Sequence, residues 1–97
     1  MTRKKNSSIE MKKIREKIDS IDSRILPLMV TRASLVSQAL ALKKKKTDII
    51  DRKRINQIKK KLSLKAKKLG GNPKLISKIW ESIIRNFIDY EKKHFKK

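Results

Sequence analysis

The sequence predicts an all-α protein built from three helices. Only two Gly and two Pro occur in 97 residues, and no segment alternates polar and apolar residues with the period of a β-strand. Apolar residues instead recur at helical spacing along three segments. A chain of this length forms one domain at most. We therefore predict a single domain over residues 1–97, with charged, frayed tails at about 1–7 and 94–97.

The first predicted helix runs from about Ser8 to about Lys44. Ser7 and Glu10 have the spacing of a capping box at its start. Pro27 costs about 3 kcal/mol inside a helix, but the apolar stripe keeps its phase across it, so we favour one kinked helix over two helices. The stripe has the spacing of a coiled-coil seam. Its positions are Ile14, Ile18, Ile21, Ile25, Leu28, Arg32, Leu35, Ala39 and Leu42.

The second and third helices have clear boundary signals. Asp51 suits the N-cap of the second helix, and Gly70-Gly71 ends it. Asn72-Pro73 supplies a cap and a proline at the first position of the third helix, which runs to about Phe95. The residues expected to face inward are Ile55, Ile58, Leu62, Ala66 and Leu69 on the second helix, and Ile76, Ile79, Trp80, Ile83, Ile84, Phe87 and Ile88 on the third.

The length of the first helix predicts self-association. At 1.5 Å per residue it is on the order of 50 Å long, and two shorter helices cannot cover so long an apolar stripe. A second copy of the chain is the simplest partner that could cover the stripe. We therefore expect an intertwined helical homodimer, with residues 43–48 connecting the first and second helices.

The charge balance is extreme, because 29 Lys and Arg outnumber 9 Asp and Glu to give a net charge of +20. Such an excess is compatible with nucleic-acid binding, with attraction to membranes or acidic proteins, or with a solvated surface that reflects residue usage. Twenty-two of the cations are Lys, and they are scattered over all three helical segments and both tails. We favour the solvated surface, and expect neither a membrane nor nucleic acid as a partner. Whether some cations serve an anionic small molecule depends on where they lie.

The absence of Cys excludes disulfides and thiolate metal sites. Met1–Lys5 is basic, but polar Asn6 follows where a signal peptide has its apolar run. No stretch approaches the roughly 18 apolar residues of a membrane span. These observations predict a cytoplasmic protein.

Three charged residues, Arg32, Lys43 and Glu91, lie where the helical pattern calls for inward positions, and a fourth, Arg15, lies about 100° off the face of Arg32. Arg32 occupies the stripe, and a buried guanidinium must meet an anion, either an acid of the protein or a ligand. Lys43 lies three turns later on nearly the same face, about 16 Å away. Arg15 is roughly 25 Å from Arg32, so only an antiparallel partner brings it to the same pocket. Glu91 continues the apolar line of the third helix, which requires a cationic partner or a bound proton. Inward cations in a helical dimer suit a polyanionic small molecule.

The order of these residues resembles a known family. The segment Ile14-Arg15-Glu16-Lys17-Ile18-Asp19-Ser20-Ile21-Asp22 is similar to the "LR-x-x-ID-x-ID" opening of the all-helical chorismate mutases. Arg32 and Lys43 follow at the family's spacing, and Asp51-Arg52-Lys53-Arg54 stands in place of its "D-x-x-R" motif. The similarity covers about residues 9–95. It implies interlocked three-helix chains with two equivalent sites that convert chorismate to prephenate, in the shikimate pathway to aromatic amino acids.

The resemblance also implies the catalytic residues, which are Arg32, Lys43 and Glu91. Arg32 would bind a substrate carboxylate, and Lys43 would contact a carboxylate and the ether oxygen of the breaking bond. Glu91 stands where a Gln or Glu contacts the same ether oxygen. A pericyclic rearrangement needs no nucleophile, metal or cofactor, so we expect none of them and interpret the single His94 as a bystander.

Six further residues are predicted to bind the substrate. Arg15 would come from the other chain to hold a carboxylate, whereas Asp51 and Arg54 would lie near the ring hydroxyl and the site entrance. The predicted substrate-binding set is Arg15, Asp51, Arg54, Ile55, Ile84 and Phe87.

Some positions depart from the mutase pattern and leave the substrate open. Position 55 is Ile where typical mutases have Glu, and position 87 is Phe where Ser is common. The connection between Lys43 and Arg54 is also one residue shorter than in typical bacterial mutases. These departures resemble isochorismate pyruvate lyase, a relative that releases pyruvate and salicylate from the same pocket. Asp51 and Glu91, however, are mutase-like. Chorismate mutase is the favoured function, the lyase is the alternative, and a basic helical nucleic-acid-binding module is the alternative of another class.

Overall fold

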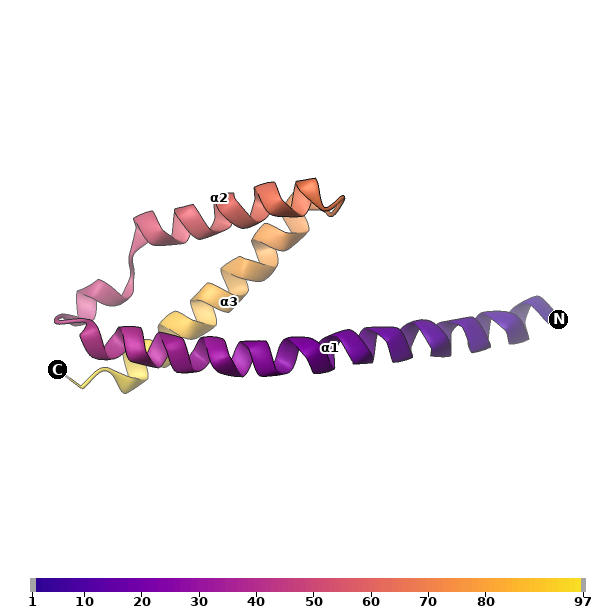
Figure 1. The fold of residues 1–97 in the computed structure, drawn as a ribbon, viewed down its shortest axis with the longest axis horizontal. Helices are drawn as coiled ribbons and strands as arrows, with labels where there is room; N and C mark the ends of the chain where they lie inside the picture. The colour runs from indigo at the N-terminus through magenta and orange to yellow at the C-terminus, as the bar shows by residue number, and fades with distance from the viewer. Residues whose placement is uncertain (1, 97) are drawn as a thin grey trace. The chain divides into compact units, whose positions relative to one another are not determined.

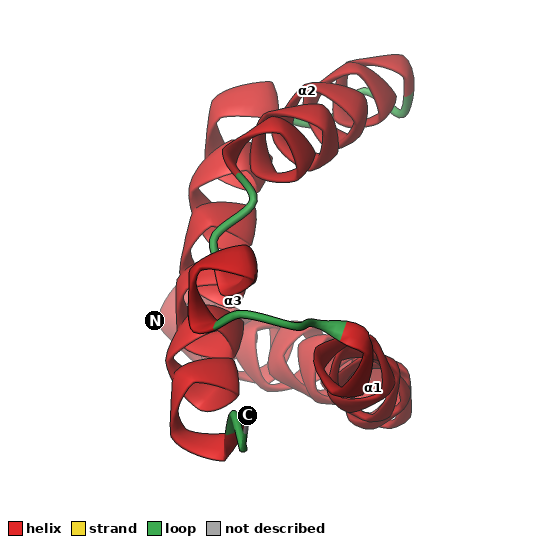
Figure 2. Ribbon diagram, turned by 90° about the vertical axis from the view of Figure 1, so that its left-hand side faces the viewer, coloured by secondary structure: helices red, strands yellow, loops and turns green. Residues whose placement is uncertain are grey.

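The structure is a computed structural model that describes residues 2–96, with side chains from residue 7 onward. Its elements in chain order are α1 (Thr2–Leu42), the 3₁₀ turn η1 (Lys46–Ile49), α2 (Arg52–Lys68) and α3 (Pro73–His94) (Figure 1). Residues 2–96 contain no β-strand (Figure 2), which confirms the all-α prediction with three helices. The chain divides between residues 34 and 35 into two compact units.

The first unit is a single stretch of α1. The helix already begins at Thr2, so the predicted start at Ser8 with a cap at Ser7 is wrong. No Gly or Pro precedes Ser7, and nothing in the sequence therefore stops the helix from extending to Thr2. The helix also continues through Pro27, which confirms one helix rather than two. Pro27 is exposed, so water can bond the carbonyl that lacks its helical donor. A kink there stays a prediction.

The apolar stripe of α1 is exposed in the single chain. Ile14, Ile18 and Ile21 are each about half exposed, and Leu28 is 70% exposed. An 18-residue window within Ser7–Leu42 has a mean hydropathy of 1.5 and is 6% buried, so by length and composition alone it could cross a membrane. The expectation that no stretch of the chain approaches the length of a membrane span is therefore wrong. One such helix near an N-terminus is weak evidence of a membrane span, because helices of soluble proteins pass the same test.

Among the described residues, the buried side chains lie in the second unit. Leu40 at the end of α1, Ile49 in η1, Ala66 in α2 and Ile84 in α3 are each less than 9% exposed. Helices α2 and α3 pack on each other as a hairpin, and η1 packs on α3 (Figure 1). This small core holds together the elements that carry most of the predicted site.

Burial in the second unit departs from the predicted pattern at a few positions. Leu69 is 87% exposed because α2 has ended at Lys68 and Leu69 is its C-cap at the tip of the hairpin. At the end of α1, Leu40 is buried, whereas the stripe residues Leu35 and Leu42 are 57% and 81% exposed. The face of α1 that packs within this unit is therefore displaced from the predicted stripe, which stays open.

The predicted helix boundaries in this unit are confirmed. The Asp51 side chain accepts a hydrogen bond from the Arg54 backbone N–H at 3.0 Å and caps α2. Asn72 Oδ1 accepts from the backbone N–H groups of Lys74 and Leu75 at 3.0 and 3.2 Å, with Pro73 as the first residue of α3. Gly70 has φ +78°, a left-handed backbone conformation that residues other than Gly rarely adopt.

Candidate active site

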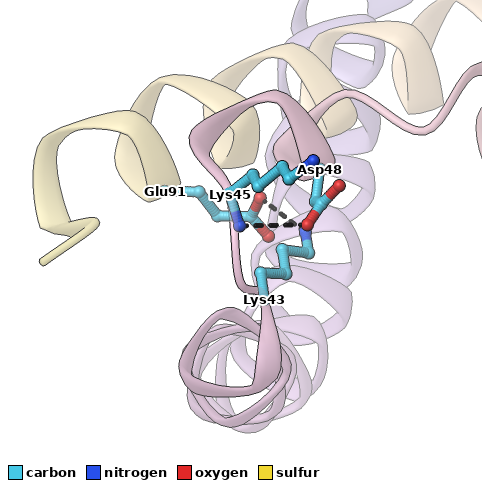
Figure 3. A network of polar contacts seen from close by, with 4 residues as sticks. All are labelled: Lys43, Lys45, Asp48 and Glu91. Atoms are coloured by element: carbon cyan, nitrogen blue, oxygen red, sulfur yellow. Dashed lines mark hydrogen bonds and ion pairs between the residues drawn. The ribbon is translucent and has the colours of Figure 1, made fainter. Parts of the chain in front are cut away.

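An ion pair between Lys43 and Glu91 forms the centre of the site in the second unit (Figure 3). The Nζ atom of Lys43 donates a hydrogen bond to Oε2 of Glu91 at 3.0 Å. Glu91 is 7% exposed, and the Lys43 side chain is 23% exposed. Of the two outcomes predicted for Glu91, a cationic partner or a bound proton, the structure has the cationic partner.

The local sequence explains how both groups are positioned. Lys43 is the first residue after α1, and its backbone N–H donates to the carbonyl of Leu40 at 3.0 Å. Glu91 lies on the inward face of α3, one turn after Phe87 and two turns after Ile84. A carboxylate buried on an apolar face is costly unless a charged donor meets it. The Lys43 ammonium supplies that donor, and a charge-assisted hydrogen bond of this kind is stronger than a neutral one.

The α3 face around Glu91 contains two more of the predicted residues. Ile84 is buried and Phe87 is half-buried, and both share the face of Glu91 at helical spacing. The structure thus brings together Lys43, Glu91, Ile84 and Phe87. Together they provide a cation and a carboxyl group beside an apolar wall.

The turn η1 lies next to the ion pair. The backbone N–H of Lys45 donates to Oδ2 of Asp48 at 3.0 Å, and this bond fixes the first residues of the turn (Figure 3). Ile49 anchors its other end in the core at 4% exposure. The sequence predicts this segment only as a connection between helices. It is instead a folded element that packs on α3.

The start of α2 carries three predicted substrate-binding residues. Asp51 is engaged as the helix cap, the Arg54 side chain is exposed, and Ile55 is half-buried. The hydrogen bond from the Arg54 backbone N–H to Asp51 lies within the first turn of α2. Among the described residues, no hydrogen bond or ion pair joins Asp51 or Arg54 to Lys43 or Glu91.

The two remaining predicted residues belong to the first unit. Arg32 is half-buried, and its Nη1 atom is shielded from solvent. Arg15 is exposed and lines an open depression on α1 together with Met11, Lys12 and Asp19. Their roles in carboxylate binding stay predictions.

A polar and aromatic cluster near the end of α3 was not predicted. The Oγ atom of Ser37 and the Tyr90 hydroxyl lie 3.3 Å apart, and the rings of Tyr90 and His94 stack with centroids 4.2 Å apart. Nδ1 of His94 lies 2.8 Å from the Tyr90 carbonyl oxygen. The spacing of four residues between Tyr90 and His94 is the only sequence signal for the stack. The cluster lines a hollow of about 380 Å³, whose residues are Ser37, Leu40, Ala41, Tyr90, His94, Phe95 and Lys96.

A second ion pair lies outside the site and joins Lys59 of α2 to Glu81 of α3. The hydrogen bond from Lys59, and then its charge, lower the pKa of Glu81. Among the described residues, no group of three or more His, Asp or Glu side chains could hold a metal ion. The expectation that the chain works without a metal or cofactor stays a prediction.

Comparison with known proteins identifies one family. The model of the family described as Chorismate mutase type II matches residues 14–92, which is most of the chain and includes Arg15, Arg32, Lys43 and Glu91. The match confirms the resemblance drawn from the sequence motifs. No curated protein and no solved structure matches the chain significantly.

Proposed function

Because the chain belongs to the chorismate mutase type II family, we propose that it is a chorismate mutase that converts chorismate to prephenate as a homodimer. The observation that carries the proposal is the Lys43–Glu91 pair, with its two polar groups 3.0 Å apart beside an apolar face. Both groups are expected to reach the ether oxygen of the bond that breaks. A cation and a hydrogen-bonding carboxyl on that oxygen are what this reaction requires.

The proposed mechanism needs binding and electrostatics alone. In the rearrangement the ether C–O bond breaks while a new C–C bond forms within the same molecule. The protein holds the dianionic substrate in its folded reactive shape, which removes most of the entropic barrier. Negative charge develops on the ether oxygen, and the Lys43 ammonium stabilises it as a preorganised donor.

Substrate binding would redistribute the partners of Lys43. In the free protein its ammonium bonds Glu91, whereas in the complex it would donate to a substrate carboxylate and to the ether oxygen. Glu91 would then face the ether oxygen itself. Its neutral form can donate a hydrogen bond there, while its anion would repel the developing charge.

The homodimer is proposed because of the exposed stripe on α1. Ile14, Ile18, Ile21 and Ile25 are each 46–52% exposed. Burying the exposed part of one such side chain contributes roughly 1 kcal/mol, so covering the whole stripe is strongly favourable. A second copy fits because its own stripe has the same length and spacing. The partner's Arg15 would then join Arg32 in binding the substrate carboxylates.

Two residues favour isochorismate pyruvate lyase as a second candidate. Ile55 and Phe87 are both half-buried, and neither can supply the polar side chain that typical mutases have at these positions. In the lyase reaction the same ether bond breaks, and a hydrogen moves from the ring to the departing pyruvate. Salicylate and pyruvate are the products, so the two functions give different compounds.

The deciding experiment is to incubate the purified protein separately with chorismate and with isochorismate, and to measure prephenate and salicylate. Prephenate from chorismate supports the mutase, and salicylate from isochorismate supports the lyase. The absence of both products would contradict the proposed function.

The Arg32→Ala variant tests the site. Loss of one charged donor to a substrate carboxylate should lower kcat/KM at least about 100-fold. Circular dichroism and sedimentation would verify that helices and dimer persist. Full turnover by this variant would remove Arg32 from the site.

A further inference from the structure

Helix α2 carries a disproportionate share of the positive charge. Nine of its 17 residues are Lys or Arg, and none is Asp or Glu. By contrast α1 contains four acidic residues and α3 contains three. A general preference for Lys in the sequence would raise the cations everywhere, but it does not explain why one helix lacks acids altogether.

The lysines of α2 gather on one side of the helix. At 100° per residue, five of them fall opposite the apolar side that packs on α3, and a sixth, Lys65, lies at the border with that apolar side. All six are exposed. We call this set the basic face, and it consists of Lys53, Lys60, Lys61, Lys65, Lys67 and Lys68. Because α2 has 17 residues, the face extends over roughly 25 Å.

The acids of the second unit do not neutralise the basic face. Asp48 accepts from the Lys45 backbone, and Asp51 caps α2. Glu81 pairs with Lys59, Glu91 pairs with Lys43, and the fifth acid, Asp89 of α3, forms no ion pair with this face among the described residues. Among the described residues, no ion pair involves a lysine of the basic face. Six like charges are therefore held side by side on a folded helix.

Although composition alone favoured a solvated surface over a nucleic-acid partner, we propose that the basic face binds the phosphate backbone of double-stranded nucleic acid without reading its sequence. Regularly spaced ammonium groups contact phosphates and release the counterions condensed on a duplex. Helix α2 contains no aromatic residue, so it offers no platform for stacking the bases of a single strand. Lysine also lacks the planar fork with which arginine reads guanine. Arg54 lies at the edge of this face and is not counted in it, because it is assigned to the substrate site.

An anionic bilayer fits the basic face less well than a duplex does. Helices that lie on membranes insert their apolar side among the lipid chains. The apolar side of α2 instead packs on α3, with Ala66 buried and Ile58 and Leu62 half-buried. Leu64, 54% exposed, is the one apolar side chain among the lysines of the basic face. A cluster of lysines whose helix has no apolar side free to insert into lipid favours the phosphates of a duplex.

The experiment measures binding of the full chain to a labelled duplex of mixed sequence by fluorescence anisotropy. Six phosphate contacts predict that affinity falls roughly 10³-fold between about 50 and about 200 mM salt. The variant with Lys60, Lys61, Lys67 and Lys68 all changed to Gln leaves two contacts, so its affinity should fall only about tenfold over the same range. It should also bind more weakly than the original chain at the lowest salt.

A matched variant separates this face from net charge. Changing Lys74, Lys78, Lys92 and Lys93 of α3 to Gln removes the same four charges, and each variant removes two lysines from the last turn of a helix. The α3 variant should keep a salt dependence close to that of the original chain. Circular dichroism verifies folding, and if the first variant unfolds, Lys60→Gln with Lys61→Gln alone should reduce the salt slope by about two.

Three results would overturn the proposal. One is no binding to the duplex at low salt, and another is an equal loss in the α2 and α3 variants. The third is tighter binding to vesicles of anionic phospholipid than to the duplex. Production of prephenate or salicylate by the variants is an independent readout, because none of the substituted lysines belongs to the proposed substrate site.

Discussion

At the scale of single residues, the Lys43–Glu91 pair has consequences for the free protein and for the complex. In the free protein the two charges satisfy each other in a mostly buried position. A substrate must supply better partners than this pair already has. The protonation of Glu91 then determines whether the carboxyl group helps or hinders the reaction.

Glu91 should contribute to activity through the hydrogen bond that its side chain makes. We expect Glu91→Gln to keep most of the activity, because an amide can donate a hydrogen bond to the ether oxygen, whereas Glu91→Ala should lower kcat/KM roughly 100-fold because a methyl group cannot. The measurement is kcat/KM of both variants and of the original chain. An Ala variant as active as the original chain would remove Glu91 from the mechanism.

Glu81 is the matched control for this prediction. It is also a glutamate of α3 paired with a lysine, and the hydrogen bond and charge of Lys59 lower its pKa. The pair lies outside the proposed site. Glu81→Ala should therefore leave kcat/KM unchanged.

At the scale of the elements, local hydrogen bonds define where the second and third helices begin. Asn72 serves as the N-cap of α3 by accepting from two backbone N–H groups. Asn72→Ala should lower the free energy of unfolding by about 1 kcal/mol, and Asn72→Ser should restore most of it. Urea denaturation followed by circular dichroism measures both. Equal stability of the Ala variant and the original chain would show that the cap contributes nothing.

The sequence was sufficient to predict the features that depend on residues close together along the chain. The caps at Asp51 and Asn72 and the left-handed Gly70 are decided within a few residues. The start of α1 was missed because a capping pattern at Ser7 does not terminate a helix that can also extend to Thr2. Local sequence preference determines where a helix begins or ends only where a Gly, a Pro or a strong cap prevents the helix from extending further.

Features that join distant segments were predicted less fully. Periodicity placed Glu91 on an inward face, and only the family resemblance brought Lys43, 48 residues away, to the same ether oxygen; the ion pair between them was not predicted. It did not predict the contact between Ser37 and Tyr90, which are 53 residues apart. These contacts depend on how elements pack, and periodicity gives the face of a helix without its neighbour.

At the scale of the whole molecule, one face of α1 packs into the intrachain core while another stays exposed. Leu40 belongs to the core of the second unit, while Leu35 and Leu42 stay exposed with the rest of the stripe. The intrachain core therefore does not compete with a second chain for the stripe. This arrangement permits the chain to fold its own core and still dimerise.

A charge on the stripe should break the proposed dimer. Ile21→Glu would bury a carboxylate between two helices, so the protein should become largely monomeric and lose activity at least about 100-fold. Ser23→Glu adds the same charge on the opposite side of the same helical turn and should change neither property. Sedimentation and product formation measure the two effects. A fully dimeric and active Ile21→Glu protein would contradict the use of this stripe as the interface.

The way Lys43 is anchored bears on how freely the neighbouring connection can vary among relatives. Its backbone is held by Leu40 at the end of α1 and its ammonium by Glu91 of α3, so neither attachment involves residues 44–50. Insertion or deletion of a residue in that connection should therefore change where α2 begins and leave the proposed catalytic cation in place. A connection of different length, as the family resemblance implies for this chain, is then compatible with the proposed chemistry.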